Sequence, residues 1–272
     1  MALTLGYSPC PNDTFIFYAM VHQKIDTGDL RFKEILLDVE TLNQKALNSG
    51  FDITKVSFHA YGHLRDTYTL LSSGGALGRG CGPLLVAKAE TTPEMLRGKK
   101  IAIPGRLTTA YLLLQLFDPA LTDDIVVMPF NQIMDSVKRG SVDAGLIIHE
   151  SRFTYSEYGL FAVEDLGRWW ESETGLPIPL GCIIAEKRLG SETIETVGTI
   201  IRKSVQYAFS HREETTGYIK AHSQELEDRV VEQHVNLYVN TYTLDLGREG
   251  TAAVQELLRR AEEKGVFNKS PV

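Results

Sequence analysis

The segment "LTLGYSPCPNDTFIFYAM" (residues 3–20) passes from a strand-like run through a proline-rich turn into a helix-like run. The short apolar run "LTLGYS" is typical of a strand, and residues 14–25 are predicted to form a helix, with Asn12 or Asp13 as its N-cap. The turn "SPCPNDTF" (8–15) therefore lies at the carboxyl end of the first strand. Because ligands of open α/β sheets bind beyond the carboxyl ends of strands, this turn is either a proline-shaped connection or one wall of a site.

The alternation of strand-like and helix-like runs continues over the first two thirds of the chain. The predicted strands after the first one lie at residues 31–39, 52–58, 83–89, 96–105, 124–130, 142–150 and 179–187. Helices between these strands predict parallel α/β sheets, and the residues after 187 are predicted to form helices.

The alternation restarts near residue 90, which predicts a second lobe. We expect an α/β protein of two lobes with a double crossover and a central cleft. The first lobe would comprise residues 1–90 plus the C-terminal helices of 185–272, and the second lobe residues 91–184.

Charge and cysteine content narrow the function classes. The 272-residue chain has a net charge of −7 and no sustained run of Lys or Arg, so a nucleic-acid or membrane partner is not expected. Cys10, Cys81 and Cys182 are far apart and form no C-x-x-C pair, which indicates neither a disulfide framework nor a zinc knuckle. Together with the absence of a signal-peptide pattern, this predicts a cytoplasmic protein.

Polar side chains occur where predicted strands end. Lys55 and Ser57 end a strand, and both could reach a carboxylate or hydroxyl, although Lys55 could instead be merely solvated. Thr108 and Thr109 begin a helix, where hydroxyls and backbone N–H groups suit a carboxylate as well as capping. His149 follows an apolar strand, where an imidazole of near-neutral pKa would suit a general base, although a structural role is the common alternative.

Other motifs have less specific interpretations. His59 and His63 have the spacing of a metal pair, but no third ligand is evident, so ordinary helix histidines are the better interpretation. The glycine-rich run at 74–82 matches no nucleotide-binding fingerprint and leaves a close backbone approach to a ligand, a hinge or a bulge open. Trp169 and Trp170 could line a ligand ring or pack between lobes.

Taken together, six motifs resemble those of the 1,4-dihydroxy-6-naphthoate synthases, enzymes of the futalosine route to menaquinone. In chain order these motifs are "SPCPNDTFIFYA", "TKVS", "GGALGRGCGP", "PGRLTTAYLLL", "GLIIHESRFTY" and "WWESETGLPIPLG". The resemblance implies a fold of the type 2 periplasmic-binding-protein class. It also implies a lyase that converts cyclic dehypoxanthine futalosine to 1,4-dihydroxy-6-naphthoate with dihydroxyacetone, without a metal or redox cofactor.

The resemblance also implies roles for individual residues. It assigns the catalytic base to His149, and substrate contacts to the residues that match its binding motifs, namely Lys55, Val56, Ser57, Thr108 and Thr109. Asn12, in the first turn, is expected to shape and contact the substrate, whereas Cys10 is not expected to react. The partner is thus a small-molecule carboxylate, and a homodimer remains one alternative for the oligomeric state.

Two rival functions share this predicted fold. One is a chorismate dehydratase of the same pathway, which also acts on a carboxylate by elimination. The other is a solute-binding protein for small carboxylates without catalysis, because a fold alone does not fix a function.

Overall fold

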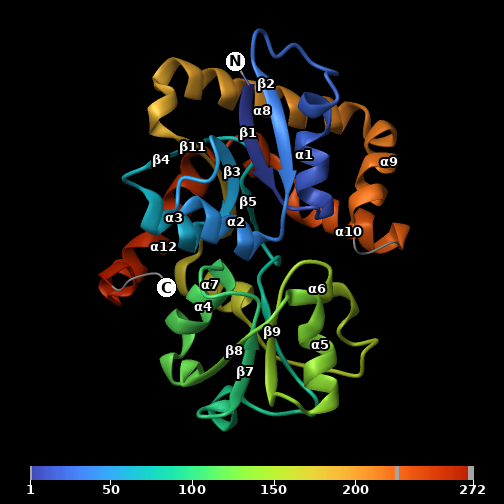
Figure 1. The fold of residues 1–272 in the computed structure, drawn as a ribbon. Helices are drawn as coiled ribbons and strands as arrows, with labels where there is room; N and C mark the ends of the chain where they lie inside the picture. Colours follow the sequence, from blue (N-terminus) through green and yellow to red (C-terminus); the bar gives the residue numbers. More distant parts are fainter. Residues whose placement is uncertain (1, 224–226, 269–272) are drawn as a thin grey trace.

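Two β-sheets form the framework of the molecule, one in each half (Figure 1). The structure is a computed structural model that describes residues 2–223 and 227–268; residues 1, 224–226 and 269–272 of the predicted first lobe lie outside this description.

The first sheet has the strand order β2-β1-β3-β11-β4, and β5 pairs with β11. Its strands are β1 (Ala2–Tyr7), β2 (Arg31–Leu36), β3 (Ile53–Ser57), β4 (Tyr68–Leu70), β5 (Ala76–Gly78) and β11 (Ile178–Glu186). The second sheet has the order β10-β6-β9-β7-β8. It contains β6 (Leu84–Ala87), β7 (Lys100–Ile103), β8 (Asp124–Val127), β9 (Ala144–Ile147) and β10 (Phe161–Asp165).

Both sheets are mixed, so the prediction of parallel sheets is wrong for the strands next to the crossovers. β11 runs antiparallel to β3, β4 and β5, and β6 runs antiparallel to β9 and β10. These two strands follow the connections between the halves, so neither is linked to its sheet neighbours by the strand–helix–strand unit that makes strands parallel. β6 also belongs to the second sheet, although the predicted boundary at residue 90 placed it in the first lobe. We therefore propose that the lobes divide before β6 and near the start of β11.

Helices cover both sheets. In the first two thirds of the chain they are α1 (Pro11–Val21), α2 (Val39–Ala46), α3 (Phe58–Leu64), η1 (Pro93–Leu96), α4 (Thr109–Phe117), η2 (Pro119–Thr122), α5 (Phe130–Arg139), α6 (Ser151–Thr154) and α7 (Leu166–Thr174). The later helices are η3 (Lys187–Leu189), α8 (Ser191–Ser210), α9 (Arg212–His222), α10 (Asp228–Tyr238), α11 (Thr241–Leu244), α12 (Gly247–Glu263) and η4 (Val266–Asn268). Within the described ranges, no helix has the length and apolar character needed to cross a membrane.

The C-terminal helices close onto the first half of the molecule, as Figure 1 shows for the orange and red segments. α8, α9 and α10 all contact α1, and the apolar side chains of α1 and α8 share one core cluster with β1. α12 contacts α3 and β11 on one side and α4 on the other, so it braces the two halves against each other.

The first helix begins earlier than predicted. α1 starts at Pro11 with Cys10 as N-cap, so the expectation of Asn12 or Asp13 as the cap is wrong. Proline is favoured in the first helical turn because its fixed φ is helical and its missing N–H would be unbonded there. Asn12 and Asp13 are consequently inside the first turn, and their side chains bond elsewhere.

Candidate active site

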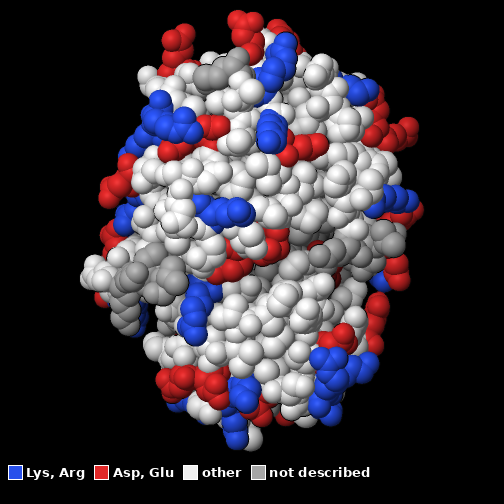
Figure 2. Space-filling model, viewed as in Figure 1, with Lys and Arg blue, Asp and Glu red and all other residues white. Residues whose placement is uncertain are grey.

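A cavity lies between the two sheets and is lined by residues of both halves of the molecule. Figure 2 shows the face of the molecule hollowed across its middle, with acidic side chains beside the hollow. All seven residues singled out in the sequence line this cavity: Asn12, Lys55, Val56, Ser57, Thr108, Thr109 and His149. The structure thus brings together segments from four strand ends, as expected for a cleft in an α/β protein.

Asp13 is the centre of a buried polar network at the first turn. Its carboxylate accepts hydrogen bonds from Ser8 Oγ at 2.8 Å, from Asn12 Nδ2 at 2.9 Å and from Lys55 Nζ at 2.9 Å. Asp13 and Lys55 are only 2% and 4% exposed, so this is a fully desolvated ion pair. Lys55 also donates to the carbonyl of Gly74 at 3.0 Å, which leaves one of its three N–H groups for a ligand.

Ser57 ends β3 and is oriented by Asn43 of α2. The Ser57 backbone N–H donates to Asn43 Oδ1 at 2.9 Å, and Asn43 Nδ2 donates to Ser57 Oγ at 3.2 Å. Asn43 in turn contacts Glu40, whose carboxylate accepts from the Leu107 backbone N–H across the cleft at 3.2 Å. Ser57 Oγ thus accepts a hydrogen bond from Asn43, and Ser57 lines the cavity.

The two threonine hydroxyls have different hydrogen-bond partners. Thr108 is the N-cap of α4, and its hydroxyl accepts from the Tyr111 backbone N–H at 3.2 Å. The Thr109 hydroxyl donates to the Leu180 carbonyl at 2.6 Å and accepts from the His59 backbone N–H at 3.3 Å. Thr109 therefore ties the start of α4 to the first sheet, and Ala110 beside it lines the cavity.

His149 follows β9 by two residues in a left-handed conformation, with φ at 57°. A non-glycine residue in this region is uncommon and is held there by its surroundings. The imidazole contacts the Phe130 ring edge-on at 5.0 Å and stacks on His234 at 6.1 Å between centroids. Burial lowers the pKa of His149 to about 4, although the charge of Asp13 opposes this shift and that of Lys55 adds to it, so the expectation of a near-neutral pKa is wrong.

His234 of α10 reaches the same region from the C-terminal helices. Its Nε2 lies 2.9 Å from Asn12 Oδ1, and its Nδ1 lies 3.6 Å from Glu150 Oε2. Since Asn12 donates its amide N–H to Asp13, its oxygen accepts from His234, which fixes the protonated nitrogen as Nε2. Burial lowers the pKa of His234 well below its ordinary value.

The remaining candidates have structural roles. His59 is buried and within 3.2 Å of the Thr108 carbonyl, and among the described residues no third donor joins His59 and His63. Trp170 is fully buried and donates to the Pro177 carbonyl at 3.1 Å, and neither tryptophan lines the cavity. Burial raises the pKa of the Cys10 thiol well above its ordinary value, which opposes formation of a nucleophilic thiolate.

Sequence reasoning missed Asn43 and His234 and gave Asp13 only a capping role. Asn43 is a fully buried polar residue on an otherwise ordinary amphipathic helix, and His234 is 1% exposed on the apolar face of α10. A polar residue at an apolar position of the helical period is the one signal that could have indicated either.

The fold and the cavity define a two-lobed α/β protein of the periplasmic-binding-protein class with a buried site between its lobes. A Candida albicans protein described as having the generic periplasmic binding protein fold superposes with a TM-score of 0.71 at 15% identity, covering 99% of this chain and 92% of that one. The structure of protein AF1704 from Archaeoglobus fulgidus is more similar, with a TM-score of 0.91 at 40% identity over 97% of this chain and 98% of that chain.

Sequence comparison identifies the family. The model of the menaquinone biosynthesis family matches residues 3–263, and this chain belongs to that family. A relative from Thermus thermophilus is 50% identical over 99% of this chain and 97% of its own length, and one from Streptomyces coelicolor is 44% identical over 97% and 94%. Both relatives are named 1,4-dihydroxy-6-naphthoate synthase.

Proposed function

We propose that this chain is a 1,4-dihydroxy-6-naphthoate synthase, a carbon–carbon lyase of menaquinone biosynthesis. In this reaction, cyclic dehypoxanthine futalosine gives 1,4-dihydroxy-6-naphthoate and dihydroxyacetone. The proposal rests mainly on the two near-full-length relatives that have this name. It is supported by the seven predicted site residues, which all line a single cavity.

His149 is the proposed general base. Its low pKa keeps the imidazole neutral over the physiological range, which is the form that accepts a proton. A base of such low pKa is weak in the empty cavity, so bound substrate must raise the pKa of His149. A substrate carboxylate in the cavity would do so, because an opposite charge favours the imidazolium.

The start of α4 is the proposed carboxylate-binding corner. Within the turn, the Thr108 hydroxyl donates a hydrogen bond to the Gly105 carbonyl. The backbone N–H groups of Thr109 and Ala110, in contrast, occupy helix positions without an intrahelical acceptor. Such groups at a helix N-terminus favour an anion, and the Ser57 hydroxyl and the remaining Lys55 N–H would bind substrate oxygens.

The cellular location and the oligomeric state of the enzyme are part of the same proposal. We expect it to act in the cytoplasm on a small carboxylate, with a homodimer as the alternative to a monomer. Light scattering during size-exclusion chromatography would decide between the two oligomeric states.

Incubation with two substrates tests the proposed activity. Cyclic dehypoxanthine futalosine should be consumed, with 1,4-dihydroxy-6-naphthoate and dihydroxyacetone appearing in equal amounts by mass spectrometry, and chorismate should be left unchanged. Dehydration of chorismate would replace this proposal with the sibling enzyme, and recovery of tightly bound but unaltered futalosine derivative would replace it with a binding protein.

A further inference from the structure

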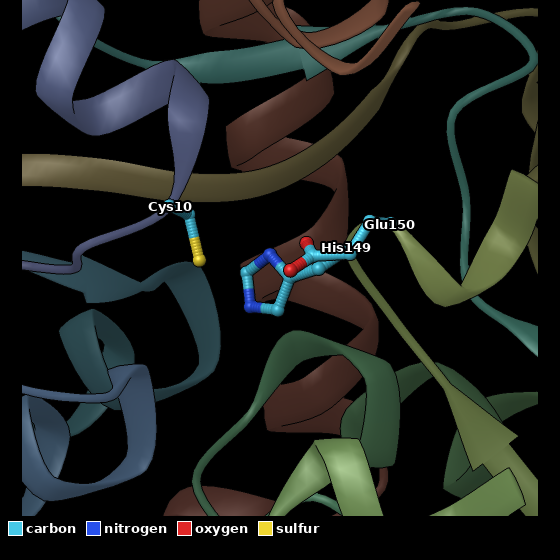
Figure 3. A group of neighbouring side chains, drawn as sticks. All are labelled: Cys10, His149 and Glu150. Carbon is cyan, nitrogen blue, oxygen red and sulfur yellow. The ribbon is translucent and has the colours of Figure 1, made fainter. Parts of the chain in front are cut away.

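Three metal-ligating side chains converge beside the cavity, and the reaction proposed above uses only one of them. Cys10, His149 and Glu150 each offer a donor atom, and these atoms all lie within 4.8 Å of one another. Figure 3 shows the Cys10 thiol pointing toward the His149 ring, with the Glu150 carboxylate beside the same ring. The three residues also line a second, adjoining cavity together with Pro9, Asp38, Val39 and Phe130.

We propose that Cys10, His149 and Glu150 form a binding site for a thiophilic divalent cation of the Zn²⁺ class, and that the bound cation inhibits the enzyme by occupying His149. The inhibition rests on the proposed role of His149 as the base, whereas the binding does not.

The donor set is the first argument. One thiolate, one imidazole and one carboxylate are the three ligand types that Zn²⁺ takes, at about 2.3 Å for sulfur and about 2.0–2.2 Å for nitrogen and oxygen. Donors around such an ion lie about 3.3–3.7 Å apart, so closing the present cluster needs side-chain shifts of roughly 1 Å. Mg²⁺ and Ca²⁺ prefer oxygen ligands throughout, so this set discriminates against them.

The surroundings of Glu150 are the second argument. Glu150 is 8% exposed, and its Oε2 lies 3.6 Å from Nδ1 of His234, which is 1% exposed. His234 Nδ1 has no hydrogen-bond partner among the described residues and is directed at this carboxylate. Because the proton of His234 is on Nε2, Nδ1 cannot donate to this carboxylate, so His234 does not compensate the charge of Glu150, and a cation bound at the cluster would do so.

The topology makes the cation a link between the two halves. Cys10 follows β1 of the first sheet, whereas His149 and Glu150 follow β9 of the second. A cation bound to all three side chains would hold the two halves together. It would also occupy the lone pair with which the His149 imidazole accepts a proton. Inhibition should therefore be accompanied by a higher Tm.

Binding is tested on the full chain, without an added histidine tag. Isothermal titration should show one Zn²⁺ per chain and no comparable binding of Mg²⁺, and Co²⁺ should give the absorption bands of tetrahedral coordination with a thiolate charge-transfer band. Cys10→Ser should weaken Zn²⁺ binding by at least about tenfold and abolish the charge-transfer band, whereas the matched variant Cys182→Ser, at a buried thiol outside the cluster, should bind as the parent does. Glu150→Gln provides a second ligand variant if Cys10→Ser does not fold.

Inhibition is tested separately. Zn²⁺ should suppress turnover of the parent and of Cys182→Ser, EDTA should restore it, and Cys10→Ser should resist the same Zn²⁺ concentration. Equal binding by the parent and Cys10→Ser would overturn the site, and activation by Zn²⁺, or binding without inhibition, would overturn the proposed inhibition. If the parent protein shows no turnover but still binds Zn²⁺ through Cys10, the proposed function is rejected and the proposed metal site is retained.

Discussion

At the scale of single residues, His149 is set apart by its environment. It is a histidine in a left-handed conformation, packed between Phe130 and His234, and its neutral form is favoured by burial. The side chain is half-buried, and the same surroundings that fix its direction also reduce its contact with solvent.

This environment predicts the pH dependence of catalysis. The active form of a general base is unprotonated, so activity falls as pH decreases through the pKa of the free enzyme's base. Because the pKa of His149 is about 4, kcat/KM should stay level between about pH 5 and 8 and decline only below that range. A pH–rate profile in constant-ionic-strength buffers measures this, and an acidic limb centred near the ordinary histidine value of about 6.5 would contradict it.

The Asp13–Lys55 pair predicts a large change in stability. Removing one partner of a buried ion pair leaves an uncompensated charge and costs about 3–5 kcal/mol. Lys55→Met should therefore lower the free energy of unfolding by that amount in urea titrations, since both groups are buried and joined at 2.9 Å.

The double variant Asp13→Asn/Lys55→Met is the control for that prediction. It removes both charges, so it should recover a substantial part of the stability lost in Lys55→Met. If the single variant unfolds within about 1 kcal/mol of the parent, the pair is not desolvated as described.

At the scale of elements, one glycine of the glycine-rich run, Gly82, lies in close contact with the backbone of α7. A Cβ atom on Gly82 would lie 2.3 Å from the Cα and N atoms of Gly167 in α7, so the two backbones touch. The close approach at Gly82 is thus to the backbone of α7, whereas the alternatives that the sequence left open were an approach to a ligand, a hinge or a bulge.

This contact predicts opposite effects of one substitution at two sites. Gly82→Ala should destabilise the fold, because backbone on the facing element cannot move aside as a flexible side chain does. Gly198→Ala in α8 meets no atom within 4 Å, so it should stabilise the fold by about 0.5–1 kcal/mol through better helix propensity. Thermal unfolding of both variants gives the comparison, and equal effects of the same sign would contradict it.

The elements also show how far the sequence predicts structure. Periodicity located the strands β1, β2, β3, β6 to β9 and β11, because alternation and apolar runs are local signals. It did not indicate β4, β5 or β10, which are short or border turns. The antiparallel direction of β6 and β11 depends on where the chain crosses between halves, and no local pattern carries that information.

At the scale of the whole molecule, the cavity exists because distant segments meet. Residues near 12, 55, 108 and 149 were predictable as strand-end positions, and all line the cavity. The contact of His234 with Asn12 was not predictable, because only tertiary packing of α10 against α1 brings the two residues together. A residue that acts by positioning another residue is recognised from its tertiary contacts, and these contacts are not evident from a single sequence.

The central claim is that the two lobes together form a lyase in which His149 is the general base. The most direct measurement is rapid-quench turnover of saturating cyclic dehypoxanthine futalosine by the parent and by His149→Asn, with folding checked by circular dichroism and substrate affinity by titration. We predict a loss of about 10²- to 10⁴-fold in kcat with substrate affinity and fold retained. Turnover by a folded His149→Asn variant within about threefold of the parent would contradict the account.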